Sequence, residues 1–195
     1  MINRRTFLGA LAGGLLAAPL AAEAQPAGKV YRIGLLGTHS GQASPMEALR
    51  VGLRDLGYME GKNIVIEHRW AEGKYDRFPA LVAELLALNV DVIVTQGGTP
   101  PALAAKRATT TTPIVMTGVG DAVGSGLVES LARPGGNVTG LTDSVPELHA
   151  KRLELLKEAV PTASRFAVLL NPGNPTNLLQ LKLIRTAASS QVMRA

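Results

Sequence analysis

The chain of 195 residues contains no cysteine. This excludes disulfide bridges, zinc sites built on thiolates, a cysteine nucleophile and a lipid anchor on cysteine. Aromatic residues are also scarce, at 4% of the chain, although hydrophobic residues make up 46%. A core must therefore be built from Leu, Val, Ile and Ala, which is typical of sheets covered by helices on both faces.

Charges of one sign do not cluster along the chain. The formal net charge is +5, but basic and acidic residues alternate and form no Lys/Arg run. A nucleic-acid surface usually shows a clustered basic stripe, so we expect no nucleic-acid partner. Charged residues amount to only 18% of the chain, which indicates a globular rather than a disordered protein.

The familiar catalytic motifs are missing from the sequence. His39, His68 and His149 show no metal-ligand spacing, and the chain contains neither a His-Glu-x-x-His string nor a Walker A string. Ser40 comes closest to a Gly-x-Ser-x-Gly elbow, but Thr38 occupies the place of the first glycine. We therefore expect no enzyme activity, no bound metal and no cofactor.

One glycine-rich loop keeps an alternative open. Gly118, Gly120 and Gly124 follow a predicted strand and form a loose version of a dinucleotide-binding loop. The loop lies after the fourth strand rather than in the first βαβ unit, and no acidic residue ends a strand about 20 residues later to hold a ribose. A periplasmic α/β enzyme that binds a nucleotide cofactor at this loop stays as the alternative function.

Residues 1–24 have the three parts of a signal peptide. Arg4 and Arg5 form a basic start, residues 7–20 are apolar, and Ala22-Glu23-Ala24 precedes Gln25 as a small-x-small cleavage site. The two arginines before an apolar pair resemble a twin-arginine signal, and an ordinary Sec signal that carries two arginines is the alternative. We expect cleavage between Ala24 and Gln25 and export to the periplasm.

Strand and helix patterns alternate from residue 30 onward. Short segments rich in β-branched residues predict strands at 30–36, 63–69, 90–95, 114–117 and 138–141. Helical spacing predicts helices at 46–56, at 78–86 after Asp76 as cap, from Pro100 after Thr99 as cap, and at 127–132. Strands alternating with helices indicate βαβ units, and so a doubly wound, parallel α/β sheet.

The pattern restarts after residue 142. It predicts a helix at 146–160, a strand at 166–170, and a helix that Asn174 caps and that starts at Pro175 and runs to about residue 190. We expect a first α/β lobe at residues 28–142 and an incomplete second lobe at residues 143–195, because a single strand cannot close a core.

Polar residues follow several of the predicted strands, at the edge where doubly wound sheets bind ligands. These candidate ligand-binding residues are Thr38, His39, Ser40, Gln96, Gly97, Gly98, Thr99, Asp121, Asn171 and Asn174. The amides of residues 97–99 can receive a carboxylate, and Asp121 can pair with an ammonium group. The alternative is that Thr99, Asp121 and Asn174 only cap helices or turns.

Several strings resemble one known family: GLRDLGYMEGKNI at 52–64, RWAEG at 69–73, DVIVT at 91–95, VGSGLVESLARPGGNVTG at 123–140, KRLELLK at 151–157 and NPGNP at 171–175. They are similar to the ABC-transporter substrate-binding proteins related to the tryptophan/tyrosine receptors, over about residues 30–186. The resemblance implies a type I periplasmic-binding fold, whose two lobes close on a small polar solute such as an amino acid.

The same resemblance implies a partner. A solute-binding component of an importer delivers its solute to an ABC permease in the inner membrane, and we expect the binding component to be a monomer. A sugar-responsive transcription regulator shares the two-lobed architecture, but it would need an N-terminal helix-turn-helix where this chain has a leader.

Overall fold

Five parallel strands form one sheet in the computed structural model, which describes residues 29–40, 43–144 and 147–192. The strands are β1 (Tyr31–Gly37), β2 (Ile64–Trp70), β3 (Val92–Gln96), β4 (Ile114–Gly120) and β5 (Val138–Ser144). They lie in the order β2-β1-β3-β4-β5, and every neighbouring pair is parallel. The predicted doubly wound α/β sheet is confirmed, while the predicted leader at 1–24 lies outside the described residues.

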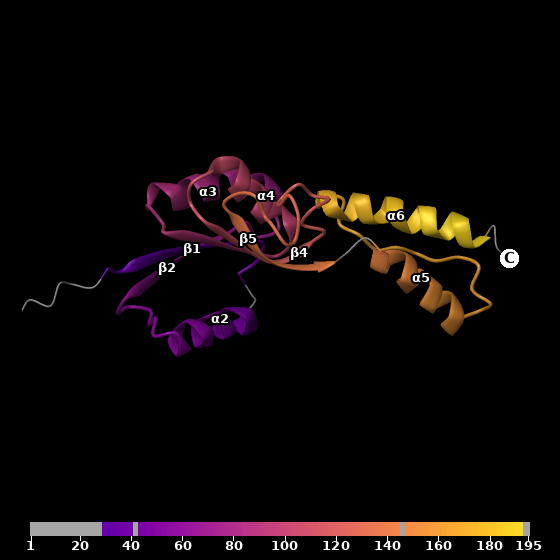
Figure 1. Cartoon of the computed structure of the whole chain (residues 1–195), viewed down its shortest axis with the longest axis horizontal. Coiled ribbons are helices and arrows are strands. Elements are labelled where there is room, and N and C mark those ends of the chain that lie inside the picture. Colours follow the sequence, from indigo (N-terminus) through magenta and orange to yellow (C-terminus); the bar gives the residue numbers. More distant parts are fainter. Residues whose placement is uncertain (1–28, 41–42, 145–146, 193–195) are drawn as a thin grey trace, which may run out of the picture.

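Helices cover both faces of this sheet (Figure 1). One face carries α2 (Ala43–Asp55), and the other carries η1 (Tyr75–Arg77), α3 (Phe78–Ala87) and α4 (Thr99–Ala108). Strand β1 shows why: Ile33 and Leu35 pack with Met46 of α2, whereas Leu36 packs with Val82 in the cluster beneath α3 and α4. Successive side chains on a strand point to opposite faces, so one strand contributes to both cores.

The helix predicted at residues 127–132 is wrong. The structure has turns from Ala122 to Gly126 and no helix at residues 127–132. The amides of Glu129 and Ser130 donate forward, to the carbonyls of Pro134 and Arg133, at 3.0 and 3.2 Å. A helix needs these amides to bond to carbonyls four residues earlier, so the tight turn at 130–133 replaces it.

Two predicted caps do not form, and one does. The N-cap of α3 is Arg77 with no side-chain cap bond, because Asp76 lies inside η1, which leads directly into the helix. The N-cap of α4 is Gly98, again without a side-chain bond, and the Thr99 hydroxyl instead donates to the carbonyl of Gly120. Asn174 does cap the last helix: its Oδ1 accepts the amide of Thr176 at 3.1 Å.

The described residues after 146 contain α5 (Glu147–Ala159) and α6 (Pro175–Val192), which pack against each other. The strand predicted at residues 166–170 is wrong for this structure, where the segment is assigned no strand and Leu169 is fully exposed. A strand is defined by its ladder partner, and the described part of this region offers no second strand to pair with. No helix among the described residues is long and apolar enough to cross a bilayer.

Candidate functional site

The loops after β1 and β3 meet at the point where the strand order reverses. These two strands are neighbours, and the chain leaves β1 toward α2 on one face and β3 toward α4 on the other. Such a switch point leaves a crevice outside the carboxyl ends of the strands, which is where doubly wound sheets bind ligands. The structure therefore places Thr38 and residues 96–99 at one edge.

Thr38 and Gly97 hold the two loops together. Thr38 is 6% exposed, its hydroxyl donates to the carbonyl of Gly97 at 3.0 Å, and its amide donates to the carbonyl of Gln96 at 3.3 Å. The Thr38 side chain lies against the α-carbon of Gly97, where a Cβ would meet it at 2.5 Å. This close approach fixes the direction in which the loop enters α4.

Few backbone amides at the N-terminus of α4 carry a hydrogen that can be donated. Gly98 has φ 97° and ψ −161°, a conformation open essentially to glycine alone. Pro100 and Pro101, in the first turn of α4, have no N–H. The amides of Gly97, Gly98 and Thr99 are thus the donors at this end of the helix, where the helix dipole favours negative charge; Gly97 is exposed, Gly98 is half-buried and Thr99 is buried.

The start of α6 lies directly against the start of α4. The Thr176 hydroxyl donates to the Thr99 hydroxyl at 2.9 Å, and the two residues are 2% and 0% exposed. The side-chain amide of Asn174 lies 3.6 Å from the position that a Cβ on Gly98 would take. Two helix N-termini, from parts of the chain 77 residues apart, therefore converge on the same edge.

Three other predicted site residues are His39, Ser40 and Asn171. The His39 imidazole lies against Gly73, and Ser40, like His39, is exposed. The Asn171 side chain accepts the amide of Gly173 at 2.9 Å and donates to the Tyr75 hydroxyl at 3.2 Å. The structure thus brings Asn171 to η1 of the first lobe rather than to the amides that precede α4.

Asp121 follows β4 and lies in a tight turn. Its Oδ1 accepts the amide of Gly124 at 2.8 Å, and its backbone has a positive φ of 44°. Burial lowers the pKa of His149 on α5, the charge of Arg152 adds to this, and the charge of Asp121 opposes it. Asp121 therefore serves as a turn cap that also faces α5, and its predicted pairing with a ligand ammonium stays a prediction.

Trp70, at the end of β2, is a packing residue in this structure. Its ring covers the α-carbon of Gly37, leaving no room for a side chain there. The ring also stacks on His68, with centroids 5.9 Å apart and planes inclined by 21°. Burial is the main cause that lowers the pKa of His68.

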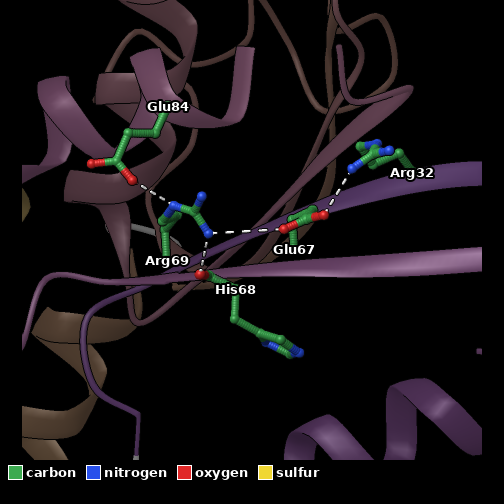
Figure 2. A network of polar contacts seen from close by, with 5 residues as sticks. All are labelled: Arg32, Glu67, His68, Arg69 and Glu84. Carbon is green, nitrogen blue, oxygen red and sulfur yellow. Dashed lines mark hydrogen bonds and ion pairs between the residues drawn. The ribbon is translucent and has the colours of Figure 1, made fainter. Parts of the chain in front are cut away.

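A network of ion pairs lies beside β2, the edge strand of the sheet (Figure 2). Arg69 donates to Glu84 of α3 at 2.6 Å, and Arg32 of β1 donates to Glu67 at 2.8 Å. His68 contributes only its backbone carbonyl, and its imidazole points away from the network. Charged edge strands resist pairing with other chains, so we assign this network to structure. The described residues contain no cluster of side chains suited to a metal ion.

A cavity of about 780 Å³ lies between α5 and α6, away from the predicted site residues. Its walls are mainly apolar, with Leu153, Phe166 and Leu181 among them. The Lys157 ammonium at its rim already donates to the carbonyls of Pro161 and Ala163, at 2.7 and 2.8 Å. The cavity lacks the converging polar groups that would orient a small polar solute.

One residue at the candidate site was not predicted from the sequence. Thr176 reaches it from the first turn of α6, through a contact that joins distant segments of the chain. The position of Thr176, next to Pro175 at a helix start, was visible in the sequence. Its partner was not, because spacing along one chain does not tell which helix ends meet.

The comparisons with known proteins agree with this architecture. The family model described as ABC transporter substrate binding protein matches residues 36–193. A tyrosine-binding protein of Clostridioides difficile is 36% identical over 129 residues, which are 66% of this chain and 36% of that protein.

Solved structures are also similar to this chain. A conserved domain protein from Vibrio cholerae has a TM-score of 0.75 and 33% identity, covering 84% of this chain and 55% of that one. An ABC domain from Streptococcus pneumonia in complex with L-Trp has a TM-score of 0.71 and 26% identity, covering 83% and 54%. The chain thus spans about a third to just over half of the length of these relatives.

The five-stranded parallel α/β sheet resembles the fold of these solved structures, and the chain belongs to the family of ABC transporter substrate-binding proteins. The family is one of binding proteins, so the alternative of a nucleotide-dependent enzyme is set aside. The type I periplasmic-binding fold expected from the sequence is confirmed.

Proposed function

We propose that this chain is the extracytoplasmic solute-binding component of an ABC importer and that its solute is an aromatic amino acid, L-tyrosine or L-tryptophan. The observation that carries the proposal is the convergence of two helix N-termini and of the Thr38 loop on one edge of the sheet, in a member of the substrate-binding family. The choice of solute follows the relatives, one a tyrosine-binding protein and one in complex with L-Trp.

The amides of residues 97–99 supply the anchor for the solute carboxylate. A carboxylate at a helix N-terminus gains roughly 0.3–1 kcal/mol from the helix dipole, and a hydrogen bond to a charged group adds about 1.5–3 kcal/mol. Asp121 would receive the ammonium group, because it is the acidic residue among the predicted site residues. Each lobe then contacts the solute, and closure of the lobes is a hinge motion.

The remaining parts of the proposal concern the whole protein. We infer an ABC permease in the inner membrane as the partner, and a periplasmic location after cleavage between Ala24 and Gln25. N-terminal sequencing of the exported protein tests the cleavage site. Replacing Arg4 and Arg5 by lysines tests the route, because export through the twin-arginine pathway would stop and Sec export would continue.

Titration followed by amide NMR tests the ligand assignment and detects weak binding as well as strong binding. We expect L-tyrosine and L-tryptophan to shift the amide signals of residues 97–99 and of Thr38. Tyramine and tryptamine are matched controls, because each keeps the ring and the amine but lacks the carboxylate. Equal shifts with tyramine, or shifts confined to the walls of the cavity between α5 and α6, would contradict the proposed anchor.

A further inference from the structure

A buried chain of hydroxyl groups joins the two lobes. The Thr176 hydroxyl donates to the Thr99 hydroxyl at 2.9 Å, and the Thr99 hydroxyl donates to the carbonyl of Gly120 at 3.3 Å. Thr176 and Thr99 are 2% and 0% exposed, so water does not compete for these bonds in this structure. The direction of these two hydrogen bonds is fixed, because each hydroxyl has a single hydrogen to donate.

This direction determines the hydrogen-bonding capacity that is left to Thr99. Its hydrogen is committed to Gly120, and one of its lone pairs receives Thr176. In this arrangement the Thr99 hydroxyl is therefore left with acceptor capacity only. Breaking the contact with Thr176 would free Thr99 to rotate and to bond with water.

The first turn of α6 is itself held against the loop before α4. Asn174 accepts the amide of Thr176, and its side-chain amide lies next to Gly98. A second contact between the lobes, from Asn171 to the Tyr75 hydroxyl, is exposed, so water can replace it. The bond between Thr176 and Thr99 is the buried one of these two contacts.

We propose that Thr176 is a positioning residue for the solute site: its buried hydroxyl orients Thr99 and holds the start of α6 against the start of α4 when the lobes are closed. The inference rests on the proposed function in so far as the amides next to the buried Thr99 bind the solute. It goes further in assigning a role to a residue on α6 that acts through another side chain.

Two substitutions of Thr176 separate its hydroxyl from its shape. Thr176→Val keeps the shape and removes the hydroxyl, and Thr176→Ser keeps the hydroxyl. Loss of one neutral hydrogen bond corresponds to a factor of roughly 2 to 12 in an equilibrium constant. We expect Thr176→Val to weaken binding of L-tryptophan by this factor through faster dissociation, and Thr176→Ser to restore wild-type dissociation.

Thr186→Val is the matched control on the same helix. Thr186 is exposed, and its hydroxyl donates only to the carbonyl of Lys182 one turn earlier. This variant changes a threonine of α6 without touching the contact between the lobes. It should therefore leave the dissociation rate and the lobe arrangement unchanged.

A measurement without solute makes the test independent of the ligand assignment. The chain has no cysteine, so cysteines introduced at the exposed positions Asp55 and Lys182 can carry a pair of spin labels. Pulsed electron resonance then reports the distribution of distances between α2 and α6. We expect Thr176→Val to broaden this distribution, and Thr176→Ser and Thr186→Val to preserve it.

The outcomes separate the two proposals. Failure of the wild-type chain to bind either amino acid would contradict the ligand assignment, while a broadened distribution in Thr176→Val would still support the positioning role. An unchanged distribution in Thr176→Val would overturn that role. A loss of affinity above roughly 100-fold would overturn it too, because it exceeds one neutral hydrogen bond and indicates that Thr176 contacts the solute directly.

Discussion

Gly98 offers the sharpest test of how the candidate site is built. Its backbone has φ 97° and ψ −161° immediately before α4, between the Gly97 carbonyl that Thr38 contacts and the buried Thr99. In the substitution Gly98→Ala, the added Cβ would have space, since the nearest atoms belong to Asn174 at 3.6 Å and Pro100 at 3.7 Å. Any effect must therefore come from the backbone conformation rather than from a clash.

The conformation of Gly98 sets the expected magnitude. Residues other than glycine in this region of φ and ψ cost about 1–3 kcal/mol. The alanine also restricts the unfolded chain, which offsets about 0.4–1 kcal/mol of this cost. We expect a net loss of roughly 1–2 kcal/mol in the free energy of unfolding. Relief of the strain would rotate the amides of residues 97–99, so binding of L-tryptophan should weaken as well.

Urea denaturation of Gly98→Ala and Gly52→Ala provides the comparison. Gly52 lies inside α2 with open space around its α-carbon, so alanine there should stabilise the chain by about 0.5–1 kcal/mol. The two variants make the same chemical change with opposite expected signs. A Gly98→Ala variant as stable as wild type would refute the assigned backbone conformation, and with it the orientation of the three amides.

Three further changes test separate features of the structure. Asp121→Asn keeps an acceptor for the Gly124 amide but removes the charge, so it should lower the affinity for L-tryptophan roughly 10-fold at an unchanged melting temperature; unchanged affinity in calorimetry would assign Asp121 to the turn alone. The Thr95 hydroxyl is buried without a hydrogen-bond partner among the described residues, so Thr95→Val should raise the free energy of unfolding by about 1 kcal/mol; a lower melting temperature would show that the hydroxyl has a partner. Burial lowers the pKa of both His68 and His149 below the ordinary value of 6.5, so the unfolded chain binds more protons. The free energy of unfolding should therefore decrease as the pH falls from about 7.5 to 5.5, and an equal value at both pH values would show that neither imidazole is buried.

The inner strands were predictable because they are largely buried, as in β1 and β3. Their β-branched runs show up in the sequence without alternation. The structure moves the bounds of β1, β2 and β3 by one or two residues, and it extends β4 and β5 three residues beyond their predicted ends. Hydrophobicity indicates a buried run, whereas the ladder of hydrogen bonds decides where a strand begins and ends. That ladder includes Gly37, which pairs with Trp70 and has no hydrophobic side chain.

The two wrong elements failed for different physical reasons. Residues 127–132 have apolar side chains at helical spacing, but the turn closed by Ser130 and Arg133 takes the amides that a helix needs. Local hydrogen bonds from serine compete with helix formation, and the apolar pattern does not register them. Residues 166–170 have the composition of a strand, but pairing depends on a second strand that the described residues after 146 do not supply.

The sequence predicted the edge of the sheet at which the candidate site lies, but it did not predict which side chains contact each other there. Parallel pairing of β1 and β3 brings the ends of these strands together, so Thr38 and residues 96–99 could be placed from the order of elements alone. The partner of Thr99 depends on how α6 approaches α4. The bond between Thr99 and Thr176 spans 77 residues and follows from that approach.

Thr99 shows what this difference means for function. At a helix start, a threonine hydroxyl usually accepts an amide of its own helix, and the sequence predicted this role. The Gly98 backbone instead makes the glycine the N-cap, which leaves the Thr99 hydroxyl free to connect Gly120 with Thr176. In the proposed site, the same glycine would expose amide donors to a carboxylate and would leave the Thr99 hydroxyl for its contact with Thr176. Solute binding and lobe closure are therefore expected to depend on one another through this turn of the chain.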